Sequence, residues 1–527
     1  MYRRTLLTGA VTGAAILASP AIGQPAGART LRMVPQASLT ALDPIWTTAS
    51  VTTGHGYAVF DTLYSLDSSL KPQPQMAEGH EVSSDGLTWR IKLREGLKFH
   101  DGERVRAADC TASLIRWSQR DSFGQTLARS VDAWEAADDR TIRIRLKQPF
   151  APLLDAIAKP ASMVAFMMPE RFAKVDGNTQ ITEMVGSGPF RFLKDEFVSG
   201  SRVAYARFGD YVPRDEPASF LAGGKRAFFD RIEWQIIPDA STAAAALRNN
   251  EVDWWEFAHP DLLPLFARDR NIKVSQIDDL GFLSILRFNT LVPPFNNPRL
   301  RAAVLAAVDQ SEYMLAVNGD NVRWQRCAAM FPCGVPFVKE LGAELMNQPR
   351  DLRRAQEAVR QAGYNGERVV IINPADFPSI APLGEVTADL LKKLGFNVEL
   401  QQMDWGTLGQ RRMSKAPTSE GGWNIFHTWT TSVSITNPAL NYYIRGQGET
   451  GWFGWYENAE IERLTGAWTQ ASTDQESQAV FDEIQQQAFQ SAPIVPLGQY
   501  YPATAHRSNL VDRISATNAL PWNIRKS

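Results

Sequence analysis

Residues 368–403 contain the pattern that most restricts the fold of this chain. Arg368 to Asn373 is a short, nearly continuous apolar strand, Pro382 to Leu394 has the composition of a helix that ends at Gly395, and Asn397 to Met403 indicates the next strand. Two strands separated by a helix-length crossover form a βαβ unit, because parallel pairing requires such a crossover. This part of the chain is therefore predicted to be α/β.

An earlier region follows a different pattern. Thr88 to Leu93 and Thr141 to Leu146 alternate between apolar and charged residues. A period of two indicates strands with one solvent-exposed face, which is typical of antiparallel sheets. Ala107 to Gln119 is predicted to be a helix between them, and Asn297-Pro298 has the order of a helix start. The fold class is thus predicted to be α/β with mixed sheets, in a chain of 527 residues that is long enough for two to four domains.

The first 28 residues have the layout of a cleavable export signal. Arg3 and Arg4 precede a short apolar stretch, Leu6 to Ala18, and small residues suited to cleavage follow at 21–23 or 26–28. The apolar stretch is too short and too rich in Gly, Ala and Thr for a good membrane span. Paired arginines are typical of a twin-arginine signal, although Sec signals also begin with them. Both export routes stay open, and we expect a soluble mature protein outside the cytoplasm.

Composition and motifs argue against several functional classes. A formal net charge of −2 argues against a nucleic-acid binder. Residues 446–451 match the spelling of a dinucleotide loop, but the residues that follow do not resemble a helix start, and neither an HExxH pair nor a phosphate-loop lysine motif occurs. The three cysteines have no matching histidines for a metal site; Cys327 and Cys333 are disulfide candidates, and Cys110 is predicted to be a buried core residue. We expect no metal, no cofactor and no catalytic residues.

A longer pattern resembles a known family. The stretch Trp89-Arg-Ile-Lys-Leu-Arg-Glu-Gly-Leu-Lys-Phe-His-Asp-Gly102, with Ala107-Ala-Asp109, closely resembles the signature of the extracellular solute-binding proteins of the dipeptide, oligopeptide and nickel ABC importers (family 5, cluster C). Further landmarks occur in the family's order: Leu42-Asp43-Pro44, residues 185–190, residues 250–253, Phe288-Asn-Thr290, Pro294-Phe295 and residues 299–309. The resemblance spans about residues 30 to 520.

This resemblance implies a fold and a function. The implied fold is the two-lobed periplasmic binding protein fold, with mixed sheets, a hinge between the lobes and an extra β-rich subdomain in the first lobe. The expected boundaries are residues 1–28 for the signal peptide, 29–60, 187–280 and 497–527 for lobe I, 61–186 for its β-rich subdomain, and 281–496 for lobe II.

The implied function is that of the periplasmic component of an ABC-type importer. Such a protein captures a small solute, here peptide-like or another organic ligand, and delivers it to permease subunits in the inner membrane. We expect a monomer without enzymatic activity. The alternatives are a periplasmic ligand sensor or a hydrolase built on the same fold, and the sequence contains no nucleophile–base set for the latter.

The resemblance also implies where the ligand binds. In peptide-binding members, one strand of the second lobe carries a Trp followed shortly by an Asp that binds the free amino group of the ligand. Here the stretch is Thr428-Trp429-Thr430-Thr431-Ser432, so the Trp is present and the acid is not. A bound ammonium would lose a charge-assisted hydrogen bond at Ser432. The ligand therefore either lacks a free α-amine or contacts an acid elsewhere in the chain.

A second stretch resembles the carboxylate-binding part of the family's site. Asp404-Trp405, followed by Arg411 and Arg412, has the spacing with which peptide-binding members place a Trp wall and a carboxylate-binding Arg. Arg suits this task because its planar guanidinium binds two oxygens at once. A solvated Arg pair at a helix end, and a Trp405 that packs only in the core, are the alternatives. Arg412 and Trp405 are our candidates.

The first lobe supplies fewer candidates. Trp46, Thr47 and Thr48 correspond to a loop that touches the ligand in relatives. For Trp46, positions inside and outside the cleft are both open alternatives. Asn289 is a further candidate early in the second lobe, on a strand that the family uses mainly structurally. Together with Thr428 to Ser432, these residues predict a site without defining the ligand.

Overall fold

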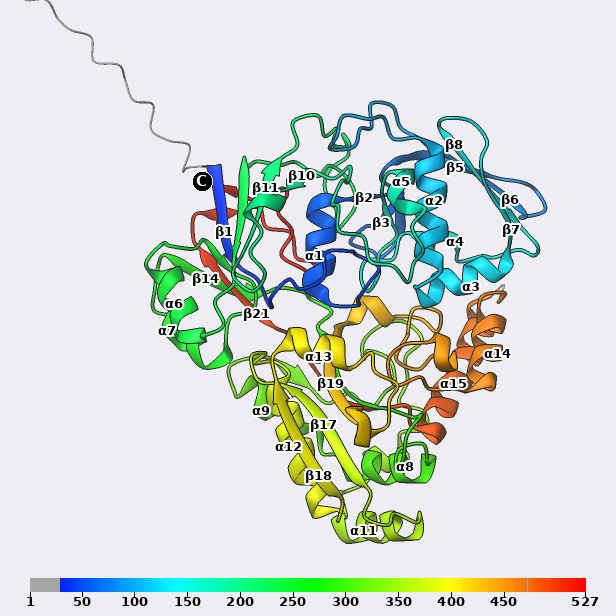
Figure 1. Ribbon diagram of the computed structural model, residues 1–527, viewed down its shortest axis with the longest axis vertical. Coiled ribbons are helices and arrows are strands. Elements are labelled where there is room, and N and C mark those ends of the chain that lie inside the picture. The colour runs from blue at the N-terminus through cyan, green and yellow to red at the C-terminus, as the bar shows by residue number, and fades with distance from the viewer. Residues whose placement is uncertain (1–28, 472) are drawn as a thin grey trace, which may run out of the picture.

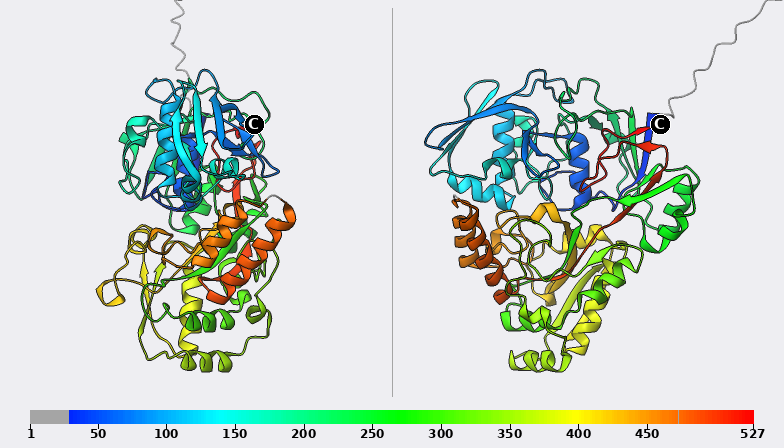
Figure 2. Two further views of the ribbon diagram at one scale, coloured as in Figure 1. Left: turned by 90° about the vertical axis from the view of Figure 1, so that its right-hand side faces the viewer. Right: turned by 180° about the vertical axis from the view of Figure 1, so that it is seen from behind.

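The computed structural model describes residues 29–471 and 473–527, and it forms two lobes, one above the other (Figures 1 and 2). The predicted signal peptide, residues 1–28, lies outside the described residues. None of the helices in the described part is long and apolar enough to cross a membrane. The predicted fold class is confirmed, since the chain is α/β with several mixed sheets.

A seven-stranded mixed sheet forms the centre of the first lobe, at the upper left of Figure 1. The strand of this sheet that comes first in the sequence pairs in parallel with two strands that come later, and the other pairs are antiparallel. The strand order is β10 (Phe190–Phe192), β11 (Arg202–Arg207), β12 (Arg231–Gln235), β1 (Thr30–Val34), β13 (Trp254–Trp255), β21 (Ala503–Arg507) and β14 (Ile272–Gln276). Both ends of the described chain therefore belong to this lobe.

A four-stranded antiparallel sheet lies beside it, at the upper right of Figure 1. Its order is β5 (Ala77–Val82), β6 (Thr88–Leu93), β8 (Thr141–Leu146) and β7 (Val131–Ala136). The two alternating stretches predicted from the sequence are β6 and β8, with the predicted bounds, and they pair directly. Ile91, Ile142 and Ile144 are buried on one face, so the period-two pattern indicates the core-facing side correctly.

A six-stranded mixed sheet forms the second lobe. The order is β16 (Trp324–Gln325), β20 (Ile494–Tyr500), β15 (Phe282–Phe288), β19 (Ile425–Thr431), β17 (Arg368–Pro374) and β18 (Asn397–Met403). The predicted βαβ unit is confirmed, because β17 and β18 are parallel and α12 (Ala381–Lys393) connects them. Gly395 follows this helix with a φ of 90°, a left-handed conformation that favours glycine.

Helices cover these sheets. The first lobe contains α1 (Ser50–Val59), α2 (Ala107–Ser118), α3 (Ser122–Ser130), α4 (Leu153–Ile157), α5 (Glu170–Ala173), α6 (Ala240–Arg248) and α7 (Leu263–Phe266). The second contains α8 (Pro298–Ala307), α9 (Gln310–Asn318), α10 (Glu344–Asn347), α11 (Leu352–Gln361), α12, α13 (Trp405–Arg411), α14 (Ala459–Trp468) and α15 (Asp474–Ser491). The predicted start of α8 is confirmed, since the Asn297 side chain accepts a hydrogen bond from the Arg299 N–H.

Three two-stranded pairs account for the remaining strands of the described residues: β2 (Asp61–Thr62) with β9 (Phe166–Met167), β3 (Tyr64–Leu66) with β4 (Pro72–Pro74), and β22 (Leu510–Val511) with β23 (Arg525–Lys526). We propose that the division into lobes follows the expected boundaries. The four-stranded sheet falls inside residues 61–186 and five strands of the six-stranded sheet fall inside residues 281–496, which supports this proposal. The sixth strand, β20, runs past residue 496 to Tyr500, so the end of lobe II lies a few residues later than expected.

The chain crosses between the two large sheets twice. One crossing is the segment 277–281, between β14 and β15, and the other is residues 501–502, between β20 and β21. Gly281 has a φ of 72°, and a Cβ there would lie 2.8 Å from the Tyr500 carbonyl oxygen. Glycine therefore lets the two crossings run close together. Short paired crossings of this kind are where hinge bending between lobes occurs.

Candidate ligand-binding cleft

The lobes enclose a small central cavity. Lobe I contributes residues 36–37, 48–51, 53 and 161–162, and lobe II contributes side chains between residues 377 and 452. The enclosed volume is about 30 Å³, which is enough for one or two water molecules. A solute therefore needs the neighbouring space or an opening of the lobes.

Two further cavities adjoin the central one. The hinge-side cavity, of about 380 Å³, includes Tyr500 and Pro502 beside the second crossing and shares Gln36, Ala37 and Phe377 with the central cavity. The outer cavity, of about 860 Å³, lies on the side of α3 and α14. It shares Thr48, Ser162, Tyr442 and Trp452 with the central cavity. The cleft thus contains three neighbouring cavities, of which the central one has the smallest volume.

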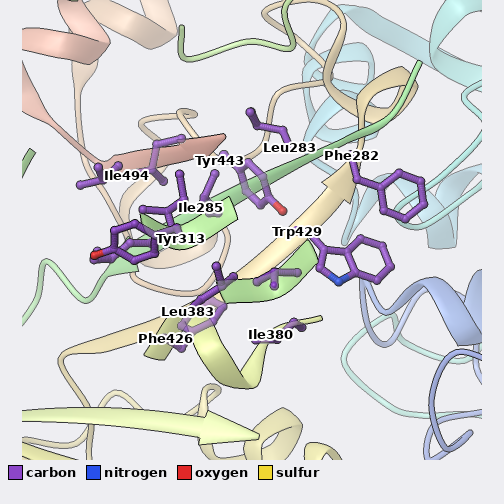
Figure 3. Packing of buried hydrophobic residues seen from close by; sticks show 14 of the residues in the cluster. Phe282, Leu283, Ile285, Tyr313, Ile380, Leu383, Phe426, Trp429, Tyr443 and Ile494 are labelled. Carbon is purple, nitrogen blue, oxygen red and sulfur yellow. The ribbon is translucent and has the colours of Figure 1, made fainter. Parts of the chain in front are cut away.

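Two tryptophans of lobe II line the central cavity while they also pack against the core. Trp429 of β19 lies 4.6 Å from Phe282, ring centroid to ring centroid (Figure 3). Its Nε1 donates a hydrogen bond of 3.0 Å to Ser379. Trp405 opens α13 and meets the edge of Phe377 at 4.9 Å. Each is 8% exposed. They are fixed aromatic surfaces, because core packing and hydrogen bonding hold their orientation.

Arg412 is the only charged side chain among the described residues that line the central cavity. It is 3% exposed, its Nη2 donates to the Thr47 hydroxyl at 3.1 Å, and its Nε has no hydrogen-bond partner. The guanidinium lies 4.6 Å from the Phe453 ring centre and 5.5 Å from that of Trp405. Burial lowers its pKa to about 10, so it stays charged at neutral pH. No carboxylate of the described residues pairs with it.

Hydroxyl groups also line the central cavity, and hydrogen bonds through them connect the two lobes. The Ser162 hydroxyl of lobe I donates to Tyr442 at 3.0 Å, and the Tyr442 hydroxyl donates to Thr430 at 3.0 Å. Trp452 donates through Nε1 to Thr48 at 3.3 Å. The neighbouring Tyr443 hydroxyl is buried near Tyr442 and Thr430 but makes no hydrogen bond of normal geometry with either. The central cavity therefore combines aromatic surfaces, neutral hydroxyls and one cation.

The structure brings most of the sequence-derived candidates together. Thr47 contacts the lobe II guanidinium from lobe I without lining the central cavity. The candidates that line it are Thr48, Trp405, Arg412, Thr428, Trp429, Thr430 and Thr431. The predicted set of ligand contacts stays a prediction, but its members from both lobes meet at one place.

Three candidates lie away from the central cavity. Asn289 is fully buried and holds the end of β15, since its side chain donates to the Trp423 carbonyl and accepts from the Leu291 N–H. Ser432 is buried just beyond β19, and its N–H donates to the Gly281 carbonyl. Trp46 is half-buried beneath the Arg120 guanidinium. In this conformation none of the three lines the central cavity.

Sequence reasoning missed several residues that line the cavity. Tyr442 and Tyr443 follow a bend after β19, and Ser162 comes from a loop near the end of the β-rich subdomain. Their proximity to Trp429 depends on loop paths, which have no periodic signal in the sequence. The adjacent Tyr pair is the one local cue, because tyrosine supplies an apolar ring and a polar tip at the same position.

A second contact between the lobes lies beside the outer cavity. Arg445 forms a bidentate ion pair with Glu462 of α14, at 2.7 and 2.6 Å, and donates to the Thr126 hydroxyl at 3.0 Å and the Ser122 carbonyl at 3.3 Å, both on α3. Arg129 of α3 approaches Glu462 at 3.8 Å. We call this group the α3–α14 contact. Each nitrogen of the Arg445 guanidinium at its centre has a hydrogen-bond partner within the protein.

The cysteines lie outside the cleft. Cys327 and Cys333 form a disulfide with an S–S distance of 2.08 Å in lobe II. Cys110 is buried in the first lobe, and burial raises the pKa of its thiol. Across residues 29–471 and 473–527, no group of three His, Cys, Asp or Glu side chains has an arrangement that could bind a metal ion.

Comparison with known proteins identifies relatives along the full chain. Residues 71–452 match the model of the bacterial extracellular solute-binding proteins, family 5. A probable peptide ABC transporter periplasmic-binding protein of Sinorhizobium fredii is 35% identical over 100% of this chain and 99% of its own length. The glutathione-binding protein of Salmonella typhi is 25% identical over 90% of this chain and 89% of its own length.

A solved structure has the same fold. The dipeptide-binding protein from Pseudoalteromonas sp. SM9913, in complex with Met-Leu, superposes with a TM-score of 0.78 over 94% of this chain and 100% of its own. The two sequences are 19% identical, so this likeness concerns the fold alone. The two-lobed periplasmic binding protein architecture is therefore supported independently of the sequence signature.

Proposed function

The chain belongs to the bacterial extracellular solute-binding proteins of family 5, and from this premise we propose that its solute is a small organic molecule with a carboxylate group. As a member of this family it is the periplasmic substrate-binding component of an ABC-type importer. It captures a solute between its lobes and delivers it to the membrane permease.

The buried charge of Arg412 supports the carboxylate most directly. Buried charges in proteins are normally paired, because an unpaired ion loses its hydration without compensation. Arg412 is 3% exposed, has one hydroxyl partner and lines the cavity at the centre of the cleft. A ligand carboxylate would supply the missing counter-ion and accept from the free guanidinium N–H groups, as the planar fork of arginine allows.

The other residues of the central cavity suit an organic body. Trp405, Trp429 and Trp452 provide flat apolar surfaces, and the Thr and Tyr hydroxyls provide neutral hydrogen bonds. No Asp or Glu is among the described residues that line this cavity. We therefore do not assign a peptide to it on family grounds alone.

Matched arginine variants test this function. Glutathione, the dipeptide Met-Leu and the C-terminal amide of Met-Leu are titrated calorimetrically into the wild type and into Arg412→Met. We expect at least one free acid to bind. The amide of Met-Leu should bind at least about tenfold more weakly than Met-Leu itself, and Arg412→Met should abolish this difference in affinity. Arg411→Met is the control, because Arg411 donates only to the carbonyls of residues 421 and 422. Equal binding of the acid and the amide would contradict the proposal.

We propose in addition that the protein acts as a monomer, has no catalytic activity and reaches the periplasm through a cleavable signal peptide. The single interlobe cleft needs no second chain to be complete, which supports the first point. Size-exclusion chromatography with light scattering tests the oligomeric state. Recovery of the bound acid unchanged after long incubation tests the absence of turnover.

A further inference from the structure

The hinge-side cavity differs from the central one in charge. Its aromatic surfaces are Trp255 and Phe257 of lobe I and Phe377 and Tyr500 of lobe II. The ionisable acids and bases that line it are Asp376, Asp404 and His259, and no described Lys or Arg lines it. Its volume of about 380 Å³ accommodates a substantial organic group. The cleft thus has a cation at its centre and carboxylates towards the hinge.

The two carboxylates have local hydrogen bonds but no cationic partner among the described side chains. Asp376 accepts from the Trp405 N–H at 2.7 Å, and Asp404 caps α13 by accepting from the Thr407 N–H at 2.9 Å. Desolvation and the nearby Asp404 charge raise the pKa of Asp376, whereas the hydrogen bonds from Thr407 lower the pKa of Asp404. Both carboxylates are exposed to solvent, and no described Lys or Arg on this cavity neutralises their negative charge.

Buried polar groups on the same cavity also have unused hydrogen-bonding capacity. The Tyr500 hydroxyl is near Ser379, but it makes no hydrogen bond of normal geometry, and Tyr500 is 2% exposed. The Gln36 Nε2, where the hinge-side and central cavities adjoin, is also buried without a partner. Buried polar groups are normally bonded, so the open Tyr500 oxygen, which can accept a hydrogen bond, indicates a missing donor group of the ligand. The open Gln36 N–H needs an acceptor instead and does not bind a cation.

We propose that the hinge-side cavity binds a cationic group, an ammonium or a guanidinium, at the far end of the same solute whose carboxylate Arg412 binds. Aromatic faces and a carboxylate together favour an organic cation. An apolar part of the solute passes Gln36 and Phe377, which line both cavities. This inference rests on the proposed function. It assigns a zwitterion with separated charges, with Asp376 as the acid that binds the cation.

A chain-length series measures the separation of the two charges. Unbranched ω-amino carboxylates of increasing length are titrated against the wild type, each paired with the monocarboxylate of the same length. Quenching of tryptophan fluorescence is the readout, because Trp405, Trp429 and Trp452 line the central cavity. We expect one chain length to bind about tenfold more tightly than its monocarboxylate partner, the gain from one added charge-assisted contact.

Two acidic variants locate the cation. Asp376→Asn should abolish the advantage of the amino carboxylate while leaving the monocarboxylate unchanged, since an Asn oxygen can still accept from the Trp405 N–H. Asp389→Asn is the control, because it removes the same charge from an exposed ion pair with Lys393 on α12. It should leave the advantage intact. Circular dichroism of both variants verifies folding.

The outcomes separate this inference from the function on which it rests. If monocarboxylates bind through Arg412 but the amino group adds nothing at any length, or if Asp376→Asn preserves its advantage, the inference is wrong and the proposed function stands. If no carboxylate of either series binds in a way that depends on Arg412, both are wrong.

Discussion

Two buried arginines of the second lobe, Arg412 and Arg445, both reach across to the first lobe, yet their surroundings differ. Arg445 has a bidentate carboxylate partner, Glu462, and two further acceptors on α3. Arg412 has one hydroxyl partner, Thr47, and aromatic rings around it. Each is 3% exposed, so burial alone does not distinguish them.

The difference shows how a structural cation is told from a binding cation. Arg445 is complete within the protein, and its bonds connect α3 and α14. Arg412 leaves charge and donors unused in a cavity, and arginine cannot shed its charge by losing a proton at neutral pH. The unused charge and hydrogen-bond donors of Arg412 at a cavity, rather than its burial alone, are the reason for assigning the ligand carboxylate to it.

The largest expected effect comes from breaking the satisfied pair. Arg445→Met leaves Glu462 partly buried without its main counter-ion, which should lower the unfolding free energy of the ligand-free protein by about 3–5 kcal/mol. Urea unfolding followed by circular dichroism measures it. Arg463→Met is the control, because its i,i+3 pair with Glu460 on the same helix is exposed and should matter by about 0.5 kcal/mol or less. Equal losses in the two variants would contradict the comparison.

The reverse pattern is expected at Arg412. Arg412→Met removes an unpaired buried charge, so the unfolding free energy of the ligand-free protein should stay level or rise, while carboxylate affinity falls by about 2–5 kcal/mol. Calorimetric titration and urea unfolding are measured on the same preparation. A variant that loses stability as strongly as Arg445→Met would show that Arg412 is structural after all.

A third buried ionisable group, Asp278, can be compared with the two arginines. It lies in the interlobe crossing formed by residues 277–281 and not in a cavity. Its Oδ1 accepts from the Leu280 N–H at 3.0 Å and its Oδ2 has no partner. Burial, with the neighbouring Asp279 charge, raises its pKa from 3.8 to about 6. Unlike Arg412, it can relieve burial of its charge by protonation.

The sign of this shift gives a pH prediction. Because the folded-state pKa is raised, the wild type gains stability from Asp278 protonation at low pH and loses it as the pH rises from about 4 to about 6. In urea unfolding at pH 7.5, Asp278→Asn should therefore have an unfolding free energy up to about 3 kcal/mol higher than that of the wild type. At pH 3.5 the two proteins should be equally stable. A gain that is the same at both pH values would contradict this account.

The smallest effect is expected for the exposed partner in the α3–α14 contact. Arg129 is 61% exposed and approaches Glu462 at 3.8 Å, so Arg129→Gln should change solute affinity by less than about 1 kcal/mol. The change should disappear in high salt, because screening weakens exposed pairs. Titrations at low and high ionic strength measure it. A large, salt-independent loss would show that this outer pair controls lobe closure.

Local pattern was enough to predict the secondary structure at several places. The bounds of β6, β8 and β18 follow from alternation and from flanking breakers, and the βαβ unit follows from a helix-length segment between two strands. The strand alternation is a property of adjacent residues, so no tertiary information is needed. Trp405, Arg412 and Trp429 were found through spacing shared with a family.

The cavity itself depends on chain segments that are far apart. Tyr442 and Tyr443 line the same cavity as Trp429, and Thr47 contacts Arg412 across 365 positions. No periodicity encodes such contacts, because they follow from how loops cross the cleft. Asn289 shows the converse, since a polar residue on the correct strand is used to bond the backbone of a neighbouring segment.

The sequence by itself determined the fold class and, through family resemblance, the role of the protein, because strand period, helix length and signature order are local properties. Only the tertiary structure decided which charges are compensated. Arg412 and Arg445 look alike in the sequence, and so do Asp376 and Asp389. Whether a buried arginine has a carboxylate partner depends on which distant segments the fold places beside it, as α14 places Glu462 beside Arg445. That difference distinguishes a binding residue from a structural one.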